Sequence, residues 1–149
     1  MSLQKEIMTQ LKTAMKAKDT VALESLRAVK SAILLAQTES GAKEELTEDQ
    51  ELKIVQKLVK QRKDSAALFI EQGRQDLADP ELAQMEVIAQ FLPEQMSEEA
   101  IKEVVVAVIS QIGAQGMKDM GKVMGIASKQ LAGKADGKTI STIVKASLA

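Results

Sequence analysis

The chain has 149 residues, a net charge of −1 and a hydrophobic content of 45%, which suffices for one ordinary core or for a core with a small satellite unit. It contains no His, Cys, Trp or Tyr and only two Phe. These absences exclude imidazole proton transfer, thiolate nucleophiles, Zn–S sites and most base stacking on aromatic rings. Any catalysis would depend on Asp, Glu, Lys or Ser alone, and we expect neither a cofactor nor a metal.

The N-terminal segment predicts a helix over about residues 3–17, because Leu3, Ile7 and Leu11 recur on one stripe. Lysines alternate with these apolar residues, so the segment has no continuous apolar region of the kind found in a secretory signal. The longest apolar runs, residues 104–109 and 33–36, are far shorter than the ~20 residues of a membrane helix. We therefore expect a cytoplasmic protein that does not enter membranes.

A second helix is expected after the N-cap candidates Asp19 and Thr20, and its pattern fades in the loop Ser40-Gly41-Ala42. The third helix begins with the capping box Thr47-Glu48-Asp49-Gln50 and runs for about 25 residues to a stop at Gly73. It is predicted to be the longest element of the chain.

A fourth helix is predicted to start with Asp79 as N-cap and Pro80 as its first residue, and to end at Phe91-Leu92-Pro93. The four helices would form an N-terminal helical domain over residues 1–93.

The composition changes near Pro93. Residues 64–103 contain ten acids and two bases, whereas only two acids follow Glu103. Ser97 is an N-cap candidate for a fifth helix that stops at Gly113, although its valine-rich stretch would also suit a strand. The helix is favoured because a lone strand among helices would leave its backbone unpaired.

A sixth helix stopped at Gly133 and a seventh carrying Ile140, Ile143, Val144 and Leu148 complete the chain. The sequence thus predicts an all-α fold, with a small three-helix C-terminal domain over residues 96–149.

The C-terminal segment combines glycines with lysines. Residues 113–149 hold six of the eight glycines, and six lysines against two acids give them a net charge of +4. Gly121 and Gly125 lie four apart within the sixth helix, where each costs about 1 kcal/mol relative to Ala. Either a phosphate backbone or partner helix approaches this bare face, or the fifth or seventh helix packs tightly on it. The sequence leaves both interpretations open.

The turn before the last helix contains Asp136 and Gly137: glycine tolerates positive φ, and Asp136 is expected to cap the helix that follows. The spacing from Gly133 to Gly137-Lys138-Thr139 is one residue short of a nucleotide-binding loop and follows a helix, so we discard that function. Lys134 and Lys138 are candidates for anion contacts, or belong to a solvated turn. The candidate nucleic-acid-binding residues are Lys118, Gly121, Lys122, Gly125, Lys129, Lys134, Asp136, Gly137 and Lys138.

In the N-terminal domain, Lys53, Lys57 and Lys60 follow one face of the third helix and are expected to be solvated. An Arg–Asp network bracing the corner after this helix is a second expectation. The residues assigned to this structural polar network are Arg27, Gln61, Arg62, Ser65, Arg74 and Asp76. Carboxylate pairs such as Glu98/Glu99 lack the partners that acid–base catalysis or metal binding requires.

Several motifs resemble, in order, those of the YqeY-like family: Leu26-Arg27 with Ser31-Ala32, Lys60-Gln61-Arg62 with Ser65 and Phe69, Gly73-Arg74 with Asp76-Leu77, Phe91-Leu92-Pro93, Asp119-Met120-Gly121-Lys122-Val123-Met124, and Ala135-Asp136-Gly137-Lys138. The resemblance covers nearly the whole chain, with Phe91 where the family often has Tyr. The family is similar to the C-terminal portion of the B subunit of the glutamine-dependent aspartyl/glutamyl-tRNA amidotransferase.

The resemblance implies a helical N-terminal domain, a three-helix C-terminal domain and a relation to tRNA, because the amidotransferase tail looks like the part that grips the tRNA body. A label of carbon–nitrogen ligase would be inherited from that amidotransferase, whose kinase and transamidase parts this chain lacks. We expect a non-catalytic module that binds tRNA or another folded RNA. The alternatives are an adaptor that docks onto an amidotransferase or a synthetase, and an accessory to amide transfer.

Overall fold

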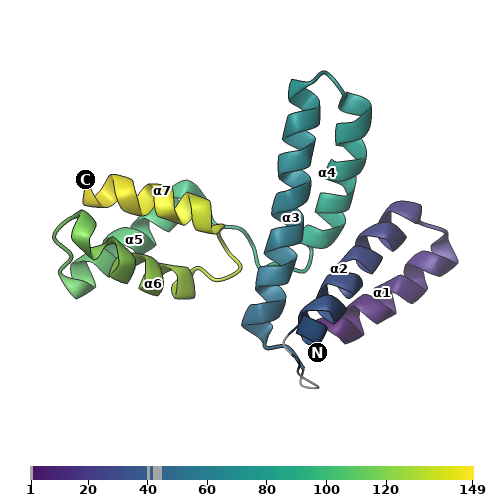
Figure 1. Ribbon diagram of the computed structural model, residues 1–149, viewed down its shortest axis with the longest axis horizontal. Coiled ribbons are helices and arrows are strands. Elements are labelled where there is room, and N and C mark those ends of the chain that lie inside the picture. The colour runs from purple at the N-terminus through teal and green to yellow at the C-terminus, as the bar shows by residue number, and fades with distance from the viewer. Residues whose placement is uncertain (1, 40, 42–44) are drawn as a thin grey trace. The chain divides into compact units, whose positions relative to one another are not determined.

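The computed structural model describes residues 2–39, 41 and 45–149, and this part of the chain consists of helices, turns and loops without a strand (Figure 1). The all-α prediction is therefore correct. The chain divides into two compact units, Met1–Leu92 and Pro93–Ala149. Each unit has its own apolar core, and each is described separately below.

The first unit begins with an antiparallel pair of helices, α1 (Leu3–Ala17) and α2 (Thr20–Glu39) (Figure 1). The hydroxyl of Ser2 caps α1, and Lys18 ends it in the left-handed conformation with φ 54°. The carboxylate of Asp19 then accepts a hydrogen bond from the N–H of Ala22 at 3.1 Å, so Asp19 caps α2 as predicted. Of the loop predicted after α2, Ser40 and Ala42 lie outside the described residues.

Helix α3 (Glu48–Glu71) opens with the predicted capping box. The N–H of Gln50 donates to the Thr47 hydroxyl at 3.3 Å, and the N–H of Thr47 donates to the Gln50 side-chain oxygen at 2.9 Å. After 24 residues the chain turns at Gly73, whose φ of 73° suits glycine. The predicted extent of this helix is confirmed.

Helix α4 (Gln75–Ala89) starts earlier than the sequence suggested, and the prediction of a start at Asp79 and Pro80 is wrong. The carbonyl of Arg74 already accepts hydrogen bonds from the N–H groups of Leu77 and Ala78, each at 3.1 Å. Pro80 is therefore the sixth residue of the helix. The helix tolerates it because proline removes a single backbone donor near the N-terminal end.

The core of the first unit takes residues from all four helices: Ile7, Leu11, Ala14, Leu26, Val29, Ile33, Val55 and Ile88. The only buried polar residue among those described is Ser25, and its hydroxyl donates to the carbonyl of Val21 at 2.7 Å. Helix α4 packs against the C-terminal part of α3, and the two helices form a hairpin (Figure 1).

The second unit comprises α5 (Glu98–Ile112), the short 3₁₀ helix η1 (Met117–Asp119), α6 (Met120–Gln130) and α7 (Gly137–Leu148). Ser97 caps α5 by accepting a hydrogen bond from the N–H of Ala100 at 3.2 Å. The valine-rich stretch is helical, since Val105 and Val108 project from α5 into the core. That core consists of Ile101, Val105, Val108, Val123, Ala127, Leu131, Ala135, Ile140, Val144 and Leu148.

In the described residues no single helix is long and apolar enough to cross a membrane. Helix α5 and the segment Met117–Gln130 reach the required length and composition only together, with a bend of 97° between them.

Candidate nucleic-acid interface

The two glycines of α6 lie on an open face of the helix. Both Gly121 and Gly125 are exposed, and a Cβ atom added at either would meet no heavy atom within 4 Å apart from the neighbouring backbone of α6 itself. The side of α6 that packs into the unit carries Val123 and Ala127, both fully buried. The interpretation that the glycines let α5 or α7 pack closely is therefore wrong, because neither helix covers them.

Exposed lysines flank this open face. Lys122 precedes Gly125 by three residues and Lys129 follows it by four, and this spacing places all three on one side of α6. Both lysines are exposed, as is Lys118 in η1. None of them forms an ion pair among the described residues, where the only ion pair is Arg74–Asp76 in the first unit. The ammonium groups of these lysines are therefore available to a ligand that approaches the exposed backbone at Gly121 and Gly125.

The loop before α6 is held by two glycines and one acid. Gly113 has φ 66° and Gly116 has φ 125°, a value that side-chain-bearing residues rarely adopt. The carboxylate of Asp119 accepts a hydrogen bond from the N–H of Gln115 at 2.9 Å. The sequence placed Asp119 in a motif but did not predict that its carboxylate closes this loop. The four-residue separation from Gln115 is short enough for such a local hydrogen bond.

The turn after α6 is joined to the start of the second unit. Leu131 ends α6, and Gly133, predicted to stop that helix, is buried with φ 76°. The side-chain N–H of Gln95 donates to the carbonyl of Gly133 at 2.7 Å, and the N–H of Met96 donates to the carbonyl of Lys134 at 3.0 Å. The Lys134 side chain remains exposed. Sequence reasoning missed Gln95, because no local pattern indicates a contact across 38 residues.

The predicted turn at Asp136 and Gly137 differs in detail. Gly137 is the first residue of α7 and does not have a positive φ, so the expected reason for glycine at this position is wrong. Asp136 occupies the N-cap position with extended backbone, yet its side chain makes no capping hydrogen bond. Lys138 lies in the first turn of α7 and is exposed, as is Lys145 seven residues later on the same side. The turn therefore leads directly into a lysine-bearing helix face.

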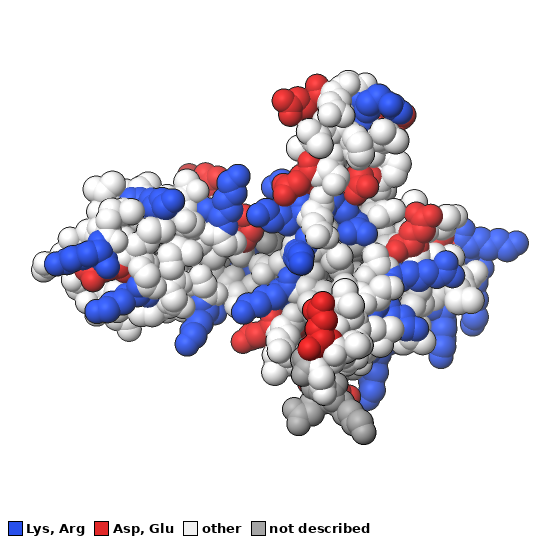
Figure 2. Space-filling view, viewed as in Figure 1, with Lys and Arg blue, Asp and Glu red and all other residues white. Residues whose placement is uncertain are grey.

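Figure 2 shows lysine side chains spread over the visible face of the second unit, with few acids among them. Among the described residues, no three acidic side chains lie close enough together to hold a metal ion. The second unit offers a ligand exposed ammonium groups and the uncovered glycine face of α6.

In the first unit, Arg74 and Asp76 form a bidentate ion pair at the corner between α3 and α4. The guanidinium donates from Nε to Oδ1 at 3.0 Å and from Nη2 to Oδ2 at 2.9 Å. These hydrogen bonds lower the pKa of the Asp76 carboxyl below its ordinary value. Both side chains are more than half exposed, so the pair braces an exposed corner.

Arg62 does not join this pair and belongs to a different chain of hydrogen bonds. Its Nε donates to the side-chain oxygen of Gln84 at 3.1 Å, and the Gln84 amide donates to Glu24 at 3.1 Å. The chain links α3, α4 and α2, and sequence reasoning missed Gln84 and Glu24. Three further residues assigned to the network form no side-chain hydrogen bond in the described part of the chain: Arg27, Gln61 and Ser65.

Comparison with known proteins finds relatives over most of this chain. The family model described as Yqey-like protein matches residues 4–148. The "Altered inheritance of mitochondria protein 41, mitochondrial" of Clavispora lusitaniae is 34% identical over 123 residues, which cover 81% of this chain and 69% of that protein. Its namesake from Kluyveromyces lactis is 34% identical over 141 residues, covering 92% of this chain and 71% of that protein.

A shorter similarity connects the chain with a much longer protein. The E subunit of the glutamyl-tRNA(Gln) amidotransferase of Thermococcus gammatolerans is 47% identical over 55 residues, which make up 37% of this chain and 9% of that protein. The match of the family model over almost every residue shows the relationship directly: the chain belongs to the YqeY-like family.

Proposed function

We propose that this protein is a non-catalytic RNA-binding module that contacts tRNA through the open face of α6 and the lysines around it. The observation that carries the proposal is the exposed pair Gly121 and Gly125 beside exposed lysines, because an added Cβ at either glycine would meet no heavy atom within 4 Å apart from the neighbouring backbone of α6. The partial similarity to part of a glutamyl-tRNA(Gln) amidotransferase supports tRNA as the ligand.

Elementary chemistry favours a phosphate backbone over bases at this face. The chain has no Trp or Tyr, so sequence-tolerant stacking of single-stranded bases has few side chains to use. Lysine ammonium groups are compact point charges suited to phosphates, and a helix face without side chains admits a backbone closely. Folded RNA is recognised largely by such shape and backbone contacts.

Binding of purified tRNA to the full chain over a range of salt concentrations tests the proposal. Lys122→Ala combined with Lys138→Ala should weaken binding and reduce the slope of log affinity against log salt by about 2, since each phosphate contact contributes about 1. Lys12→Ala with Lys16→Ala on α1 is the matched control, with the same charge change on exposed residues. The proposal fails if tRNA does not bind at low salt, or if the two double variants bind equally well.

The absence of catalysis is part of the proposal and has its own assay. We expect glutaminase and transamidation measurements on the purified chain to give no turnover; the chain contains neither Cys nor His, so only Asp, Glu, Lys or Ser could supply a nucleophile or a base. Clear turnover would show that the module is an enzyme.

One observation favours a second function, that of a protein-interaction adaptor. Leu68 and Ile70, near the end of α3, are 52% and 49% exposed, and Leu77 in α4 is 39% exposed. Apolar side chains of this size on a hairpin suit a protein partner such as an amidotransferase or a synthetase. A pull-down with and without ribonuclease separates the two functions, because a contact through RNA disappears after digestion and a direct protein contact does not.

A further inference from the structure

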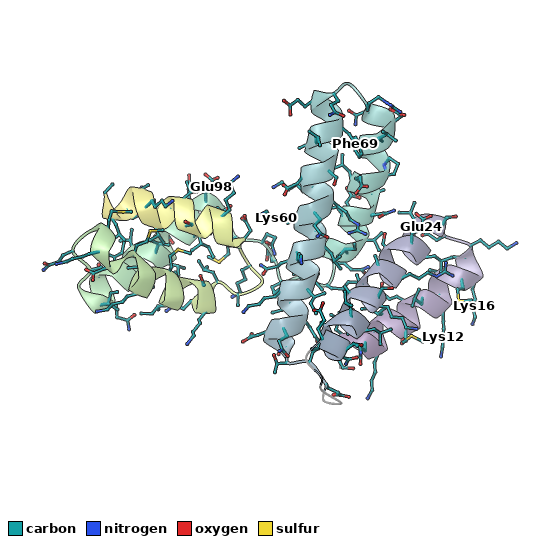
Figure 3. All side chains as sticks on the ribbon, in the orientation of Figure 1. Lys12, Lys16, Glu24, Lys60, Phe69 and Glu98 are labelled. Atoms are coloured by element: carbon teal, nitrogen blue, oxygen red, sulfur yellow. The ribbon has the colours of Figure 1, made fainter. Side chains whose placement is uncertain are left out.

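A ladder of four lysines follows the exposed face of α3. Lys53, Lys57, Lys60 and Lys63 are separated by four, three and three residues, and all four side chains are exposed. The opposite side of the helix carries the buried Val55. Figure 3 shows Lys60 on the side of α3 away from α4, and Figure 2 shows basic side chains in a line along this helix. At 1.5 Å per residue the ladder is about 15 Å long.

No lysine of the ladder forms an ion pair among the described residues. Residues 52–63 contain five bases and no acid, and this stretch is flanked by exposed Asp49 and Asp64, which lie four residues from Lys53 and Lys60. The fifth base, Arg62, is hydrogen-bonded to Gln84 and to the carbonyl of Leu58, so it lies apart from the ladder. Like charges three or four residues apart on a helix repel one another, and no ion pair among the described residues relieves this repulsion. A ligand with negative charge would relieve this repulsion.

The chemistry of the ladder selects one class of partner. No large apolar residue between residues 53 and 63 is exposed. The ladder therefore lacks the large side chains that carry most of the binding energy of protein interfaces. It also lacks the apolar face of a helix that binds membranes. A row of ammonium groups of one sign suits a polymer with regularly spaced negative charges, such as a phosphodiester backbone.

We propose that Lys53, Lys57, Lys60 and Lys63 form a second RNA-backbone contact, so that both units of the chain hold the same RNA. This inference rests on the proposed function and adds to it a surface in the first unit. Two weak contacts joined by a short connection bind more tightly than either alone, because the second contact forms within one complex. The first unit ends at Leu92, and Gln95 and Met96 already hydrogen-bond within the second unit, so only a few residues connect the two contacts.

Lysines on α1 supply an internal control. Lys5, Lys12 and Lys16 are also exposed, but only Lys12 and Lys16 are three or four residues apart. These lysines lie beside the exposed side chains of Met8 and Met15, so this face is more apolar than the ladder. The triple variant Lys5→Gln/Lys12→Gln/Lys16→Gln removes the same charge from the same unit as Lys53→Gln/Lys57→Gln/Lys60→Gln. Circular dichroism of both variants establishes that the fold is retained.

The experiment measures binding of purified tRNA to the full chain over a range of salt concentrations. The α3 triple variant should bind about tenfold more weakly at low salt and lose about 2 to 3 units of salt slope, whereas the α1 variant should lose less than half of that. Equal losses in the two variants, or no loss in the α3 variant, would overturn the inference.

The two proposals fail in different ways. If Lys122→Ala with Lys138→Ala weakens binding and the α3 variant does not, the second contact is refuted while the interface on α6 remains. The opposite result refutes the interface on α6. A polyglutamate peptide serves as a probe for an acidic protein partner, and the inference is also refuted if the α3 variant loses peptide binding but keeps tRNA binding.

Discussion

The carboxylate of Asp119 accepts a hydrogen bond from the backbone N–H of Gln115 at 2.9 Å, and this contact closes the loop that leads into α6. The loop also carries Lys118, one of the exposed lysines next to the open glycine face. Because Asp119 ends η1 immediately before α6 begins, its hydrogen bond orients the first turn of the helix on which the candidate interface lies.

Replacing Asp119 tests this contact. Asp119→Ala removes the acceptor for the Gln115 N–H and should lower the free energy of unfolding by about 1 kcal/mol. Asp119→Asn keeps an oxygen at the same position and should lose less than half of that. Urea denaturation of both variants measures the difference, and equal losses would show that the hydrogen bond does not stabilise the loop.

Substitutions at Gly125 separate stability from binding. Gly125→Ala should raise the free energy of unfolding by about 1 kcal/mol, because alanine favours the helix and its Cβ meets no neighbour. Gly125→Leu should also fold, yet it places a bulky side chain between Lys122 and Lys129. We expect it to weaken tRNA binding while the melting temperature stays at or above that of the parent chain. Unchanged tRNA affinity in Gly125→Leu would exclude close approach at this face.

Gly116 should respond in the opposite direction. Its φ of 125° is a conformation that alanine adopts only with strain, so Gly116→Ala should cost about 1 to 3 kcal/mol although no atom obstructs the Cβ. Thermal unfolding of Gly116→Ala beside Gly121→Ala checks the contrast, since the second glycine is helical. A stabilised Gly116→Ala variant would contradict the backbone conformation described for this loop.

The hydrogen-bond chain between the helices of the first unit gives a further prediction. Gln84→Ala removes a partner from both Arg62 and Glu24, and we expect a loss of about 1 to 2 kcal/mol of unfolding free energy. Gln61→Ala on the exposed side of α3 is the control and should change stability by less than about 0.5 kcal/mol. Chemical denaturation measures the stability of both variants, and equal stability would show that these hydrogen bonds do not stabilise the first unit.

Glu51 on α3 should make stability depend on pH. Partial burial raises the pKa of its carboxyl above the ordinary value, the neighbouring carboxylates Glu48 and Glu45 raise it further, and the backbone N–H of Leu3 acts in the opposite direction. In the interval between the ordinary pKa and the raised one, the folded state binds more protons than the unfolded state. This group therefore adds stability as the pH falls through its folded-state pKa, and that contribution is lost as the pH rises.

Glu51→Gln should remove this dependence. Relative to the parent chain, the variant should have a higher free energy of unfolding at about pH 7 than at about pH 4, because the glutamate of the parent chain is charged at pH 7 and largely protonated at pH 4. Asp49→Asn in the same turn is the charge-matched control, as Asp49 is exposed. A difference between Glu51→Gln and the parent chain that is constant over this range would contradict the raised pKa.

The sequence alone determined the features of this protein that arise from local interactions. Periodic apolar residues specified the helices, and short-range caps specified several of their ends, as with Asp19 before α2, Thr47 before α3 and Gly113 after α5. These signals span a few residues and act through the backbone of a single turn, so they can be read without a fold. At Pro80 the sequence was misleading, because a proline near a helix start does not determine which of the preceding residues begins the helix.

The tertiary structure decided which side chains meet across the chain and which surfaces remain uncovered. Gln95 contacts the carbonyl of Gly133, and Arg62 reaches Gln84, because distant segments fold against one another. The sequence showed that Gly121 and Gly125 share a helix face but not whether another helix covered it. Only the packing of α6 through Val123 and Ala127 decided that the glycines face outward, since burial of one side of a helix fixes the exposure of the other.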